Sequence, residues 1–510
     1  MPALNKHLHK HGTCLDTFWR SGENFASYAK QGLKWAVSQA APLRRVHVGN
    51  DLYLHDGAAY ASGGHLANTK VDGHTYAGGQ QQYLMRNVDF QGGMSGGAWS
   101  MVHVGNIGDV PASSPGTETS PAITVVDTPK VRIEKPYVAL QDGGKRFDLR
   151  VPRPLFETRQ TVGPLFDVTL EDARDFTRVR VVREDEPVSR IQEALDDGKD
   201  VVLAPGIFYL DVTIKIRTPN QVILGVGLAS LVAPSDGSPC IHVAPSVAGV
   251  RIAGIMLEAS EKDTNMPSPD MPATLLEWGD EGVIDAGQKE SPGALFDVFC
   301  RVGGATIGRR DAIAVDTMMR LHSGNIVGDN LWLWRADHAE LGPSEEANYP
   351  NISTIFWQTE KNEYRVETGI EVFGDDVTMY GLAVEHANGH QTVWSGDRGV
   401  VHFYQNEFPY GVLRSYGESD FRGFLLKDHV REHDLYSPGI YSNFRNDNVV
   451  VSTAIEHPES PFITIHNPFT VKRDNNGGID SIVNDKGGAA HIKGIPIRMP
   501  LGAPTASTTF

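Results

Sequence analysis

The stretch at residues 374–386, GDDVTMYGLAVEH, is the one that decides the expected fold. It joins a Gly-Asp-Asp turn to a short β-rich run that ends in an acidic residue followed by histidine. The turn has counterparts before neighbouring runs, in Gly328-Asp329-Asn330 and Gly396-Asp397-Arg398. Asp and Asn favour such turns, so Asp375 and Asp376 are interpreted as structural. Repetition of turn, strand and polar end predicts a solenoid of stacked coils.

The acid–histidine dipeptide recurs through the C-terminal half of the chain. The acids stand at positions 337, 385, 432 and 456, so the intervals are 48, 47 and 24 residues, about one or two multiples of 24. Glu407 fills the gap, 22 residues after Glu385 and 25 before Glu432. If each period is one coil, these carboxylates form a ladder with rungs about 4.8 Å apart, the spacing of strands in a sheet.

Composition supports an all-β protein and narrows its partners. The chain has 510 residues, 40% of them hydrophobic, with 53 glycines and 30 prolines, which suits many short strands joined by turns. A formal net charge of -17 argues against nucleic acid or an anionic membrane as a partner. Three cysteines without paired spacing indicate neither a disulfide framework nor a metal site. No apolar run approaches the roughly 20 residues of a membrane helix.

The distribution of turn residues along the chain predicts two tandem units. Residues 1–110 show short runs separated by Gly, Asn and Asp and are expected to form a first, shorter β-helix; residues 111–180 are a linker with bridging strands. Residues 187–197, PVSRIQEALDD, predict a helix that caps a second solenoid over residues 181–500. The predicted fold is therefore all-β, a right-handed parallel β-helix of the pectin-lyase-like type, in two tandem units.

Several stretches resemble a group of large secreted bacterial proteins that often carry the label adenylyl cyclase or coagulation factor 5/8 type domain protein. Neither label describes an activity that these motifs show. The stretches are KWAVSQAAPLRR at 34–45, RIEKP at 132–136, WRADH at 334–338, the stretch at 374–386 and IYSNF at 440–444. More distantly, the architecture is similar to glycoside hydrolase family 55, β-1,3-glucanases built from two tandem right-handed β-helices with the active site between them.

The resemblance implies an extracellular location, although no signal peptide is visible at the polar start of the chain. Members of the first group begin with another coil or two before the equivalent of Trp19, so an incomplete N-terminus is expected. The resemblance to family 55 is architectural, and no catalytic residue is carried over from it.

The ladder supplies the candidate catalytic residues. Glycosidic cleavage needs one carboxyl group to protonate the leaving oxygen and a second to attack or to activate water, about 5–5.5 Å apart for retention or 6.5–9.5 Å for inversion. Stacked carboxylates also raise each other's pKa, which keeps one protonated near neutral pH. Aromatic faces and polar side chains near the acids would hold the sugar. The catalytic candidates are Asp337, Glu385, Glu407 and Glu432, and the substrate-binding candidates are Trp334, Arg335, His338, His386, Trp394 and Tyr410.

The sequence favours a glycoside hydrolase that cleaves a polysaccharide with paired carboxylates and no cofactor, with β-1,3-glucan as the substrate that the resemblance implies. A polysaccharide lyase is one alternative; it would use basic residues or calcium, and the acidic net charge and the scarcity of clustered Lys or Arg count against it. A non-catalytic carbohydrate-binding or adhesion β-helix is the other alternative, since it would keep the aromatic residues without needing the acids.

Overall fold

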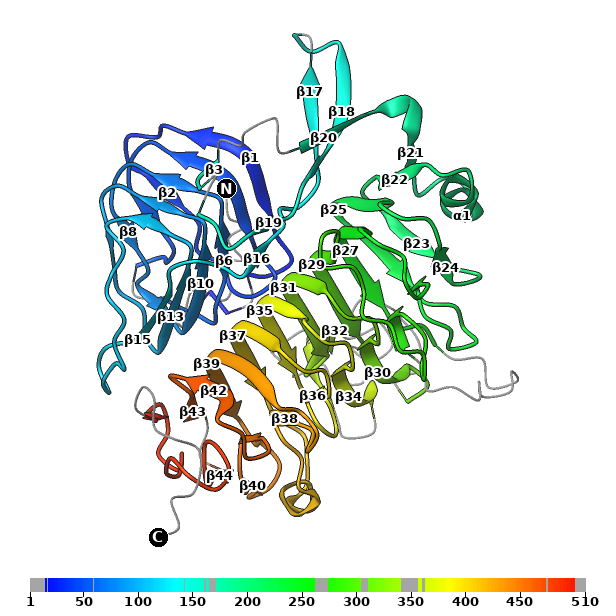
Figure 1. Ribbon diagram of the computed structural model, residues 1–510. Helices are drawn as coiled ribbons and strands as arrows, with labels where there is room; N and C mark the ends of the chain where they lie inside the picture. The colour runs from blue at the N-terminus through cyan, green and yellow to red at the C-terminus, as the bar shows by residue number, and fades with distance from the viewer. Residues whose placement is uncertain are drawn as a thin grey trace.

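The computed structural model describes residues 14–15, 17–57, 59–141, 143–159, 162–164, 171–261, 274–303, 311–340, 356–359, 363–473 and 476–499. Their strands form two sets of mostly parallel sheets, which lie side by side and are joined by an antiparallel connector (Figure 1). We call residues 22–126 the N-terminal set and residues 179–498 the C-terminal set. Among the described residues, no helix has the length and apolar character needed to cross a membrane.

The N-terminal set comprises a nine-stranded and a four-stranded sheet within the described residues. The larger runs β14 (Ile107–Gly108), β11 (Asp89–Phe90), β7 (Lys70–Val71), β3 (Leu43–Val48), β6 (His65–Ala67), β10 (Gln82–Arg86), β13 (Ser100–Val104) and β15 (Ala122–Val126), with β1 (Gly22–Ser27) on β3. The smaller runs β12 (Met94–Ser95), β8 (Thr75–Tyr76), β4 (Leu52–Tyr53) and β2 (Leu33–Lys34), and β5 (Tyr60–Ala61) pairs with β9 (Gly79–Gln80). The set includes β15, so it continues past residue 110, where the sequence placed the start of the linker.

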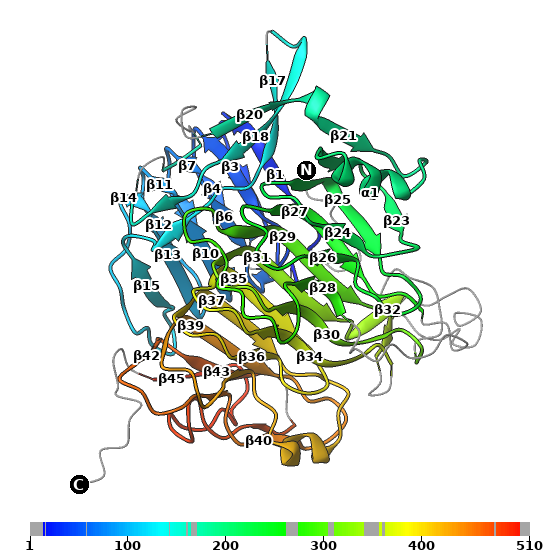
Figure 2. The same cartoon turned by 45° about the vertical axis from the view of Figure 1, so that its right-hand side comes forward.

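The connector is antiparallel. β16 (Val131–Arg132) pairs with β19 (Leu155–Phe156), and β17 (Tyr137–Gln141), β18 (Arg146–Pro152) and β20 (Glu171–Asp175) form a projecting ribbon, seen at the top of Figure 2. A 3₁₀ turn, η3 (Phe176–Arg178), leads into the C-terminal set. The helix predicted at residues 187–197 is confirmed as α1 (Ser189–Asp196), whose Ile191, Ala194 and Leu195 are buried against the first coil.

The C-terminal set comprises a thirteen-stranded and an eight-stranded sheet within the described residues. The larger runs β21 (Val179–Val182), β22 (Asp200–Leu203), β25 (Val222–Val232), β27 (Arg251–Glu258), β29 (Gly293–Val302), β31 (Ile326–Arg335), β35 (Thr378–Glu385), β37 (Gly399–Glu407), β39 (Glu432–Ser442), β43 (Phe469–Lys472) and β45 (Pro496–Arg498), with β23 (Ile207–Tyr209) on β25 and β42 (Phe462–His466) on β39. The smaller runs β24 (Ile214–Ile216), β26 (Ile241–Val243), β28 (Thr274–Trp278), β30 (Ala314–Leu321), β34 (Arg365–Val372), β36 (Thr392–Trp394), β38 (Phe424–Leu426) and β41 (Ile455–Glu456).

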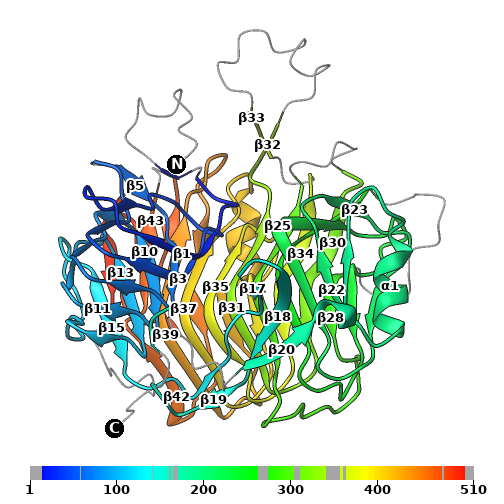
Figure 3. The same cartoon turned by 90° about the horizontal axis from the view of Figure 1, so that it is seen from above.

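Shorter pieces complete the described elements. They are β32 (His338–Glu340) with β33 (Phe356–Gln358), β40 (Val450–Val451) with β44 (Gly478–Ile479), and the 3₁₀ turn η4 (Arg414–Ser419). An apolar core runs the length of the C-terminal set, between its two long sheets. Figure 3 shows the stacked strands of this set from above.

The central strands of the larger C-terminal sheet are buried on both faces. Every residue of β31, β35 and β37 is buried, because one face lines the apolar core and the other packs against the N-terminal set. Strands of a sheet that is covered on both faces have continuous apolar sequences rather than alternating apolar and polar residues. The polar side chains on these strands therefore face the N-terminal set or stand at the strand ends, and both places matter for the site.

The turn pattern is confirmed at two of its three positions. Asp375 Oδ1 accepts from the backbone N–H of Asp397, Arg398 pairs with Asp375 and Asp376, and Asp376 and Arg398 both have positive φ, so these stacked residues form a turn. The prediction was wrong for Gly328-Asp329-Asn330. These residues lie inside β31, where Asp329 is the Cα partner of Tyr380 and faces the N-terminal set.

Candidate active site

Two of the candidate carboxylates meet at the ends of neighbouring strands. Glu385 ends β35 and Glu407 ends β37, and the parallel register makes them direct Cα partners. Their residues are only 2% and 9% exposed. The 22-residue interval is thus one coil, and the two acids form adjacent rungs as the spacing predicted.

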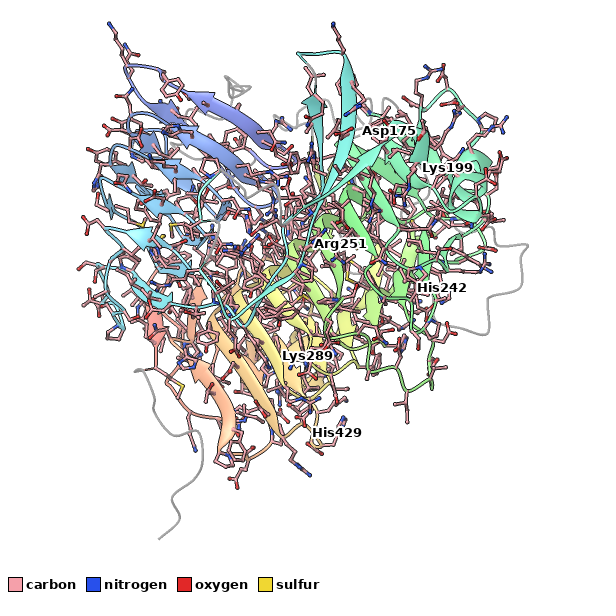
Figure 4. The ribbon with its side chains drawn as sticks, turned by 45° about the horizontal axis from the view of Figure 1, so that its top comes forward. Asp175, Lys199, His242, Arg251, Lys289 and His429 are labelled. Carbon is pink, nitrogen blue, oxygen red and sulfur yellow. The ribbon has the colours of Figure 1, made fainter. Side chains whose placement is uncertain are left out.

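Glu385 is held by one donor from each set of strands. The side-chain amide of Gln39 donates from Nε2 to Glu385 Oε1 at 3.0 Å, and the indole of Trp332 on β31 donates from Nε1 to Oε2 at 2.9 Å. Gln39 lies in the N-terminal part of the chain, just before β3. The carboxyl group therefore sits in the contact between the two sets, where side chains fill the space in Figure 4.

Burial first and the charge of Glu407 second raise the pKa of Glu385 to about 8, although the N–H donors of Trp332 and Gln39 act to lower it. A carboxyl group with this pKa keeps a proton at neutral pH. The acid pair, Glu385 with Glu407, therefore offers a protonated and a second carboxyl group at one place, which is the combination that general acid catalysis requires.

Further polar and aromatic groups surround the acid pair on the C-terminal side. The imidazole of His386 meets the ring of Tyr410 edge-on, with centroids 4.5 Å apart, and the guanidinium of Arg445 lies 4.2 Å from the Tyr410 centroid. Burial and then the charges of Glu407 and Asp337 hold the pKa of Tyr410 well above its usual value. Burial lowers the pKa of His386, although the negative charges of Asp337 and Glu407 act to raise it. Asp337, His386 and Tyr410 are therefore brought to the acid pair.

Two side chains of the C-terminal set beside the acid pair are hydrogen-bonded to the N-terminal set. Arg473 Nη1 donates to Gln81 Oε1 at 2.8 Å, and Tyr441 Oη donates to Gln82 Oε1 at 2.7 Å. Tyr441 is the Cα partner of Glu407, and its ring lies 5.3 Å from that of Trp99. Although burial lowers the pKa of Arg473, the charge of Glu407 raises it on balance. A cation and two aromatic rings thus border the acid pair.

Two candidates do not reach the acid pair. Glu432 begins β39 and is exposed; its N–H donates to Asp397 at the opposite end of the strand from the end that Glu407 occupies on β37. The sequence predicted Glu432 as a member of the ladder because it follows Glu407 by 25 residues, about one coil. Such an interval does not reveal at which end of its strand a residue lies. Trp394, expected in a groove, is a core residue instead: it is fully buried and stacks on Phe424 at 6.0 Å. Trp334 does lie beside the acid pair, as the Cα partner of Glu385, but it is buried and packs against Trp19 at 6.2 Å.

Arg335 has a structural role. Its guanidinium donates to the backbone carbonyl oxygens of Tyr364 at 2.9 Å and Glu363 at 2.7 Å, so it fixes the chain where β34 begins. Burial lowers its pKa to about 10. The side chain of His338 lies outside the described part of the structure. Among the described residues, no group of three His, Cys, Asp or Glu side chains could hold a metal ion.

Sequence reasoning missed Gln39, Trp332, Tyr441 and Arg473. Trp332 is one of many aromatic residues in this part of the chain, and no local pattern distinguishes it from those that only pack the core. Gln39 is 346 residues from its partner Glu385, and no local pattern distinguishes it from other polar residues near a strand. The resemblance to enzymes with the active site between two β-helices was the single signal that pointed to the N-terminal part.

The fold and this arrangement of carboxyl groups define a β-helical protein of the pectate-lyase-like class. A family model described as the LAM55 pectate lyase-like domain matches residues 179–407, from the start of β21 to Glu407 itself. An exo-β-1,3-glucanase from Streptomyces sp. (strain SirexAA-E / ActE) is 32% identical over 485 residues, which are 93% of this chain and 73% of the relative.

Solved structures agree with the sequence matches. The structure of sacteLam55A from Streptomyces sp. SirexAA-E superposes with a TM-score of 0.83 at 30% identity, covering 96% of this chain and 84% of that chain. A variant of sacteLam55A in complex with glucose superposes with a TM-score of 0.82 at 28% identity, covering 97% and 84%. The chain belongs to glycoside hydrolase family 55, which bears out the more distant of the two resemblances.

Proposed function

We propose that the protein is a secreted β-1,3-glucan hydrolase that removes sugar units from chain ends, with Glu385 and Glu407 as its catalytic pair. The observation that carries the proposal is the buried, in-register acid pair between the two sets of strands, in a chain 32% identical to an exo-β-1,3-glucanase. We also propose that the two sets are tandem right-handed β-helices, since nearly all parallel crossovers are right-handed.

The acid pair matches what glycosidic cleavage demands. One carboxyl group donates its proton to the oxygen of the leaving sugar while the other attacks the anomeric carbon or takes a proton from the attacking water. Arg473 stabilises negative charge that remains on the pair. Trp99 and Tyr410 are partly exposed and offer aromatic faces, which suits pyranose rings with their apolar faces and polar edges.

Isosteric variants test the acid pair. Glu385→Gln and Glu407→Gln should each lower the release of glucose from a linear β-1,3-glucan by about 10²- to 10⁴-fold, the range for loss of a general acid or base. A β-glucosyl fluoride separates the roles, because fluoride leaves without protonation: the variant of the acid keeps turnover on the fluoride, and the variant of its partner does not. Glu432→Gln is the matched control, since it changes an exposed acid outside the pair.

The alternatives give different readouts in the same assay. A lyase would release products with an ultraviolet-absorbing unsaturated end from a uronate polymer. A binding β-helix would retain β-1,3-glucan and release no sugar. Normal turnover in both Glu385→Gln and Glu407→Gln would reject the assignment of the acid pair even if the wild type hydrolyses glucan.

A further inference from the structure

A second group of charged side chains is buried where the two sets of strands meet. At its centre is Asp329 on β31, which has partners on three strands of the N-terminal set, two arginines and a histidine whose pKa burial lowers. They are Arg44 Nη2 at 2.8 Å from Oδ1, His65 Nε2 at 3.0 Å from Oδ1, and Arg86 Nη2 at 2.5 Å from Oδ2. One carboxylate therefore ties β3, β6 and β10 to the C-terminal set.

Arg44 extends the group to the next strand. Its Nη2 lies 2.6 Å from Asp297 Oδ1, and Lys135 of the connector lies 2.9 Å from Asp297 Oδ2. The side chains of Arg44, Asp297 and Asp329 are 2%, 1% and 0% exposed. Burial alone would raise the pKa of Asp329, but Arg44 and Arg86 hold it well below its usual range. Buried charges of this kind persist only with close partners, so the contact has little freedom to shift.

The same two chain segments also hold Glu385. Gln39, which donates to Glu385 Oε1, stands five residues before Arg44, and Trp332, which donates to Oε2, stands three residues after Asp329. A small cavity is lined by Gln39, Asn330 and Trp332 of these two segments and by His65 of β6. A shift of Arg44 relative to Asp329 therefore moves Gln39 relative to Glu385.

We propose that Asp329 and Arg44 are positioning residues for the acid pair: their ion pair sets the approach of the N-terminal set and so keeps the Gln39 amide on Glu385. This inference depends on the proposed glucanase function only for its predicted effect on turnover. Without the ion pair, Gln39 withdraws and the ionised form of Glu385 loses a donor.

The direction of the effect follows from the groups that face Glu385. The N–H groups of Trp332 and Gln39 lower its pKa, and the negative charges of Glu407 and Asp337 raise it. The other titratable groups whose charges interact with Glu385 are Tyr404 on β37, Tyr441 on β39 and Arg473 after β43. Loss of the Gln39 donor alone leaves these groups in place, so the pKa of Glu385 must rise.

The test uses Arg44→Lys in the full-length protein. Lysine keeps the buried cation but cannot bridge Asp297 and Asp329 with one planar fork. Glu385 titration is followed by tryptophan fluorescence against pH, and the component that reports Glu385 is identified by its loss in Trp332→Phe. The matched control is Asn467→Ala, which removes another buried contact between the sets, 2.8 Å from Asn467 Nδ2 to Thr124 Oγ1, away from Glu385.

We expect Arg44→Lys to move the fluorescence midpoint to higher pH and to lower kcat about 10- to 100-fold with KM nearly unchanged, as for a small misplacement of a catalytic group. Asn467→Ala should lower thermal stability without moving the midpoint. A folded Arg44→Lys with an unmoved midpoint overturns the proposal. A moved midpoint with full turnover upholds the positioning and rejects instead the catalytic role of Glu385. If Arg44→Lys does not fold, His65→Asn, which removes one weaker contact to Asp329, decides by the same readouts.

Discussion

At the scale of single residues, the acid pair couples catalysis to stability. Glu385 is buried and its pKa is raised to about 8, whereas the same group in the unfolded chain titrates near its ordinary value of 4.5. The folded state therefore binds more protons than the unfolded state between these two pH values. The contribution of Glu385 to stability is fully present below about pH 4.5 and is lost as the pH rises through 8. At a pH where it is ionised, a buried catalytic carboxyl group of this kind lowers the free energy of unfolding.

Glu385→Gln should therefore stabilise the protein while it lowers activity. Glutamine fills the same space without the cost of ionising in a buried site, so its advantage over the wild type grows from about pH 4.5 to pH 8 and reaches on the order of 4–5 kcal/mol. Urea unfolding at pH 5 and pH 8.5 measures both free energies. Equal free energies of unfolding for wild type and variant at pH 8.5 would mean that the carboxyl group ionises without cost.

At the scale of elements, the coil repeat was predictable and the position within a coil was not. The interval of 22 residues correctly placed Glu385 and Glu407 on neighbouring strands, because adjacent coils of similar length bring equivalent residues into register. The acid–histidine pattern failed at Glu432 and Glu456: the first opens β39, and the second ends β41 in the smaller sheet, where it pairs with Arg422 at 2.6 Å. The interval also miscounted one coil: Asp337 follows β31, which pairs directly with β35, so the 48 residues to Glu385 are one coil rather than two. Loops of unequal length change both the interval and the position of a residue within its coil.

Stacked rings illustrate an element-scale device that the sequence does not show. Tyr380, His402, Tyr436 and His466 lie in register on β35, β37, β39 and β42, with successive centroids 4.9, 4.8 and 4.4 Å apart. Within the described part of the chain, neither ring nitrogen of buried His402 has a hydrogen-bond partner. Burial lowers its pKa to about 3. The unfolded chain takes up this proton below about pH 6.5 and the folded chain does not, so acid destabilises the fold through His402.

His402→Phe should keep the stack and remove that penalty. Phenylalanine preserves the ring contacts with Tyr380 and Tyr436 and has no polar atoms to bury, so we expect a gain of about 1 kcal/mol at pH 7.5. The gain should be larger at pH 5, where the unfolded wild type is protonated. Thermal melts of both proteins at the two pH values provide the measurement, and a gain that does not change with pH would contradict the role of the imidazole.

At the scale of the whole molecule, the site exists because two distant parts of the chain meet. Gln39, Gln81 and Trp99 come from the N-terminal set, and the acid pair comes from the C-terminal set. Each is an ordinary polar or aromatic residue in its own stretch of sequence. Packing between the sets, rather than any local pattern, gives them their function, and this is why the sequence indicated the carboxylates but not their donors.

Gly439 on β39 shows how closely the two sets approach beside the site. A Cβ at this position would lie 2.6 Å from Gln82 Oε1 in the N-terminal set and 2.5 Å from the ring of Phe469. Gln82 accepts from Tyr441 at 2.7 Å and donates to the backbone carbonyl of Tyr404 at 3.2 Å, so it links both sets next to Glu407. The absence of a side chain at Gly439 is therefore a requirement of the contact.

Gly439→Ala should separate the sets locally and affect stability and activity together. We expect a loss of about 1–3 kcal/mol, the usual cost of overpacking, and a lower kcat/KM on β-1,3-glucan because Tyr441 moves with Gln82. Urea unfolding and initial rates on the glucan measure the two effects. A Gln82→Ala background removes one of the clashing side chains, so the substitution at Gly439 should cost less there. Additive losses in the double variant would show that the contact between Gly439 and Gln82 does not limit how closely the two sets pack.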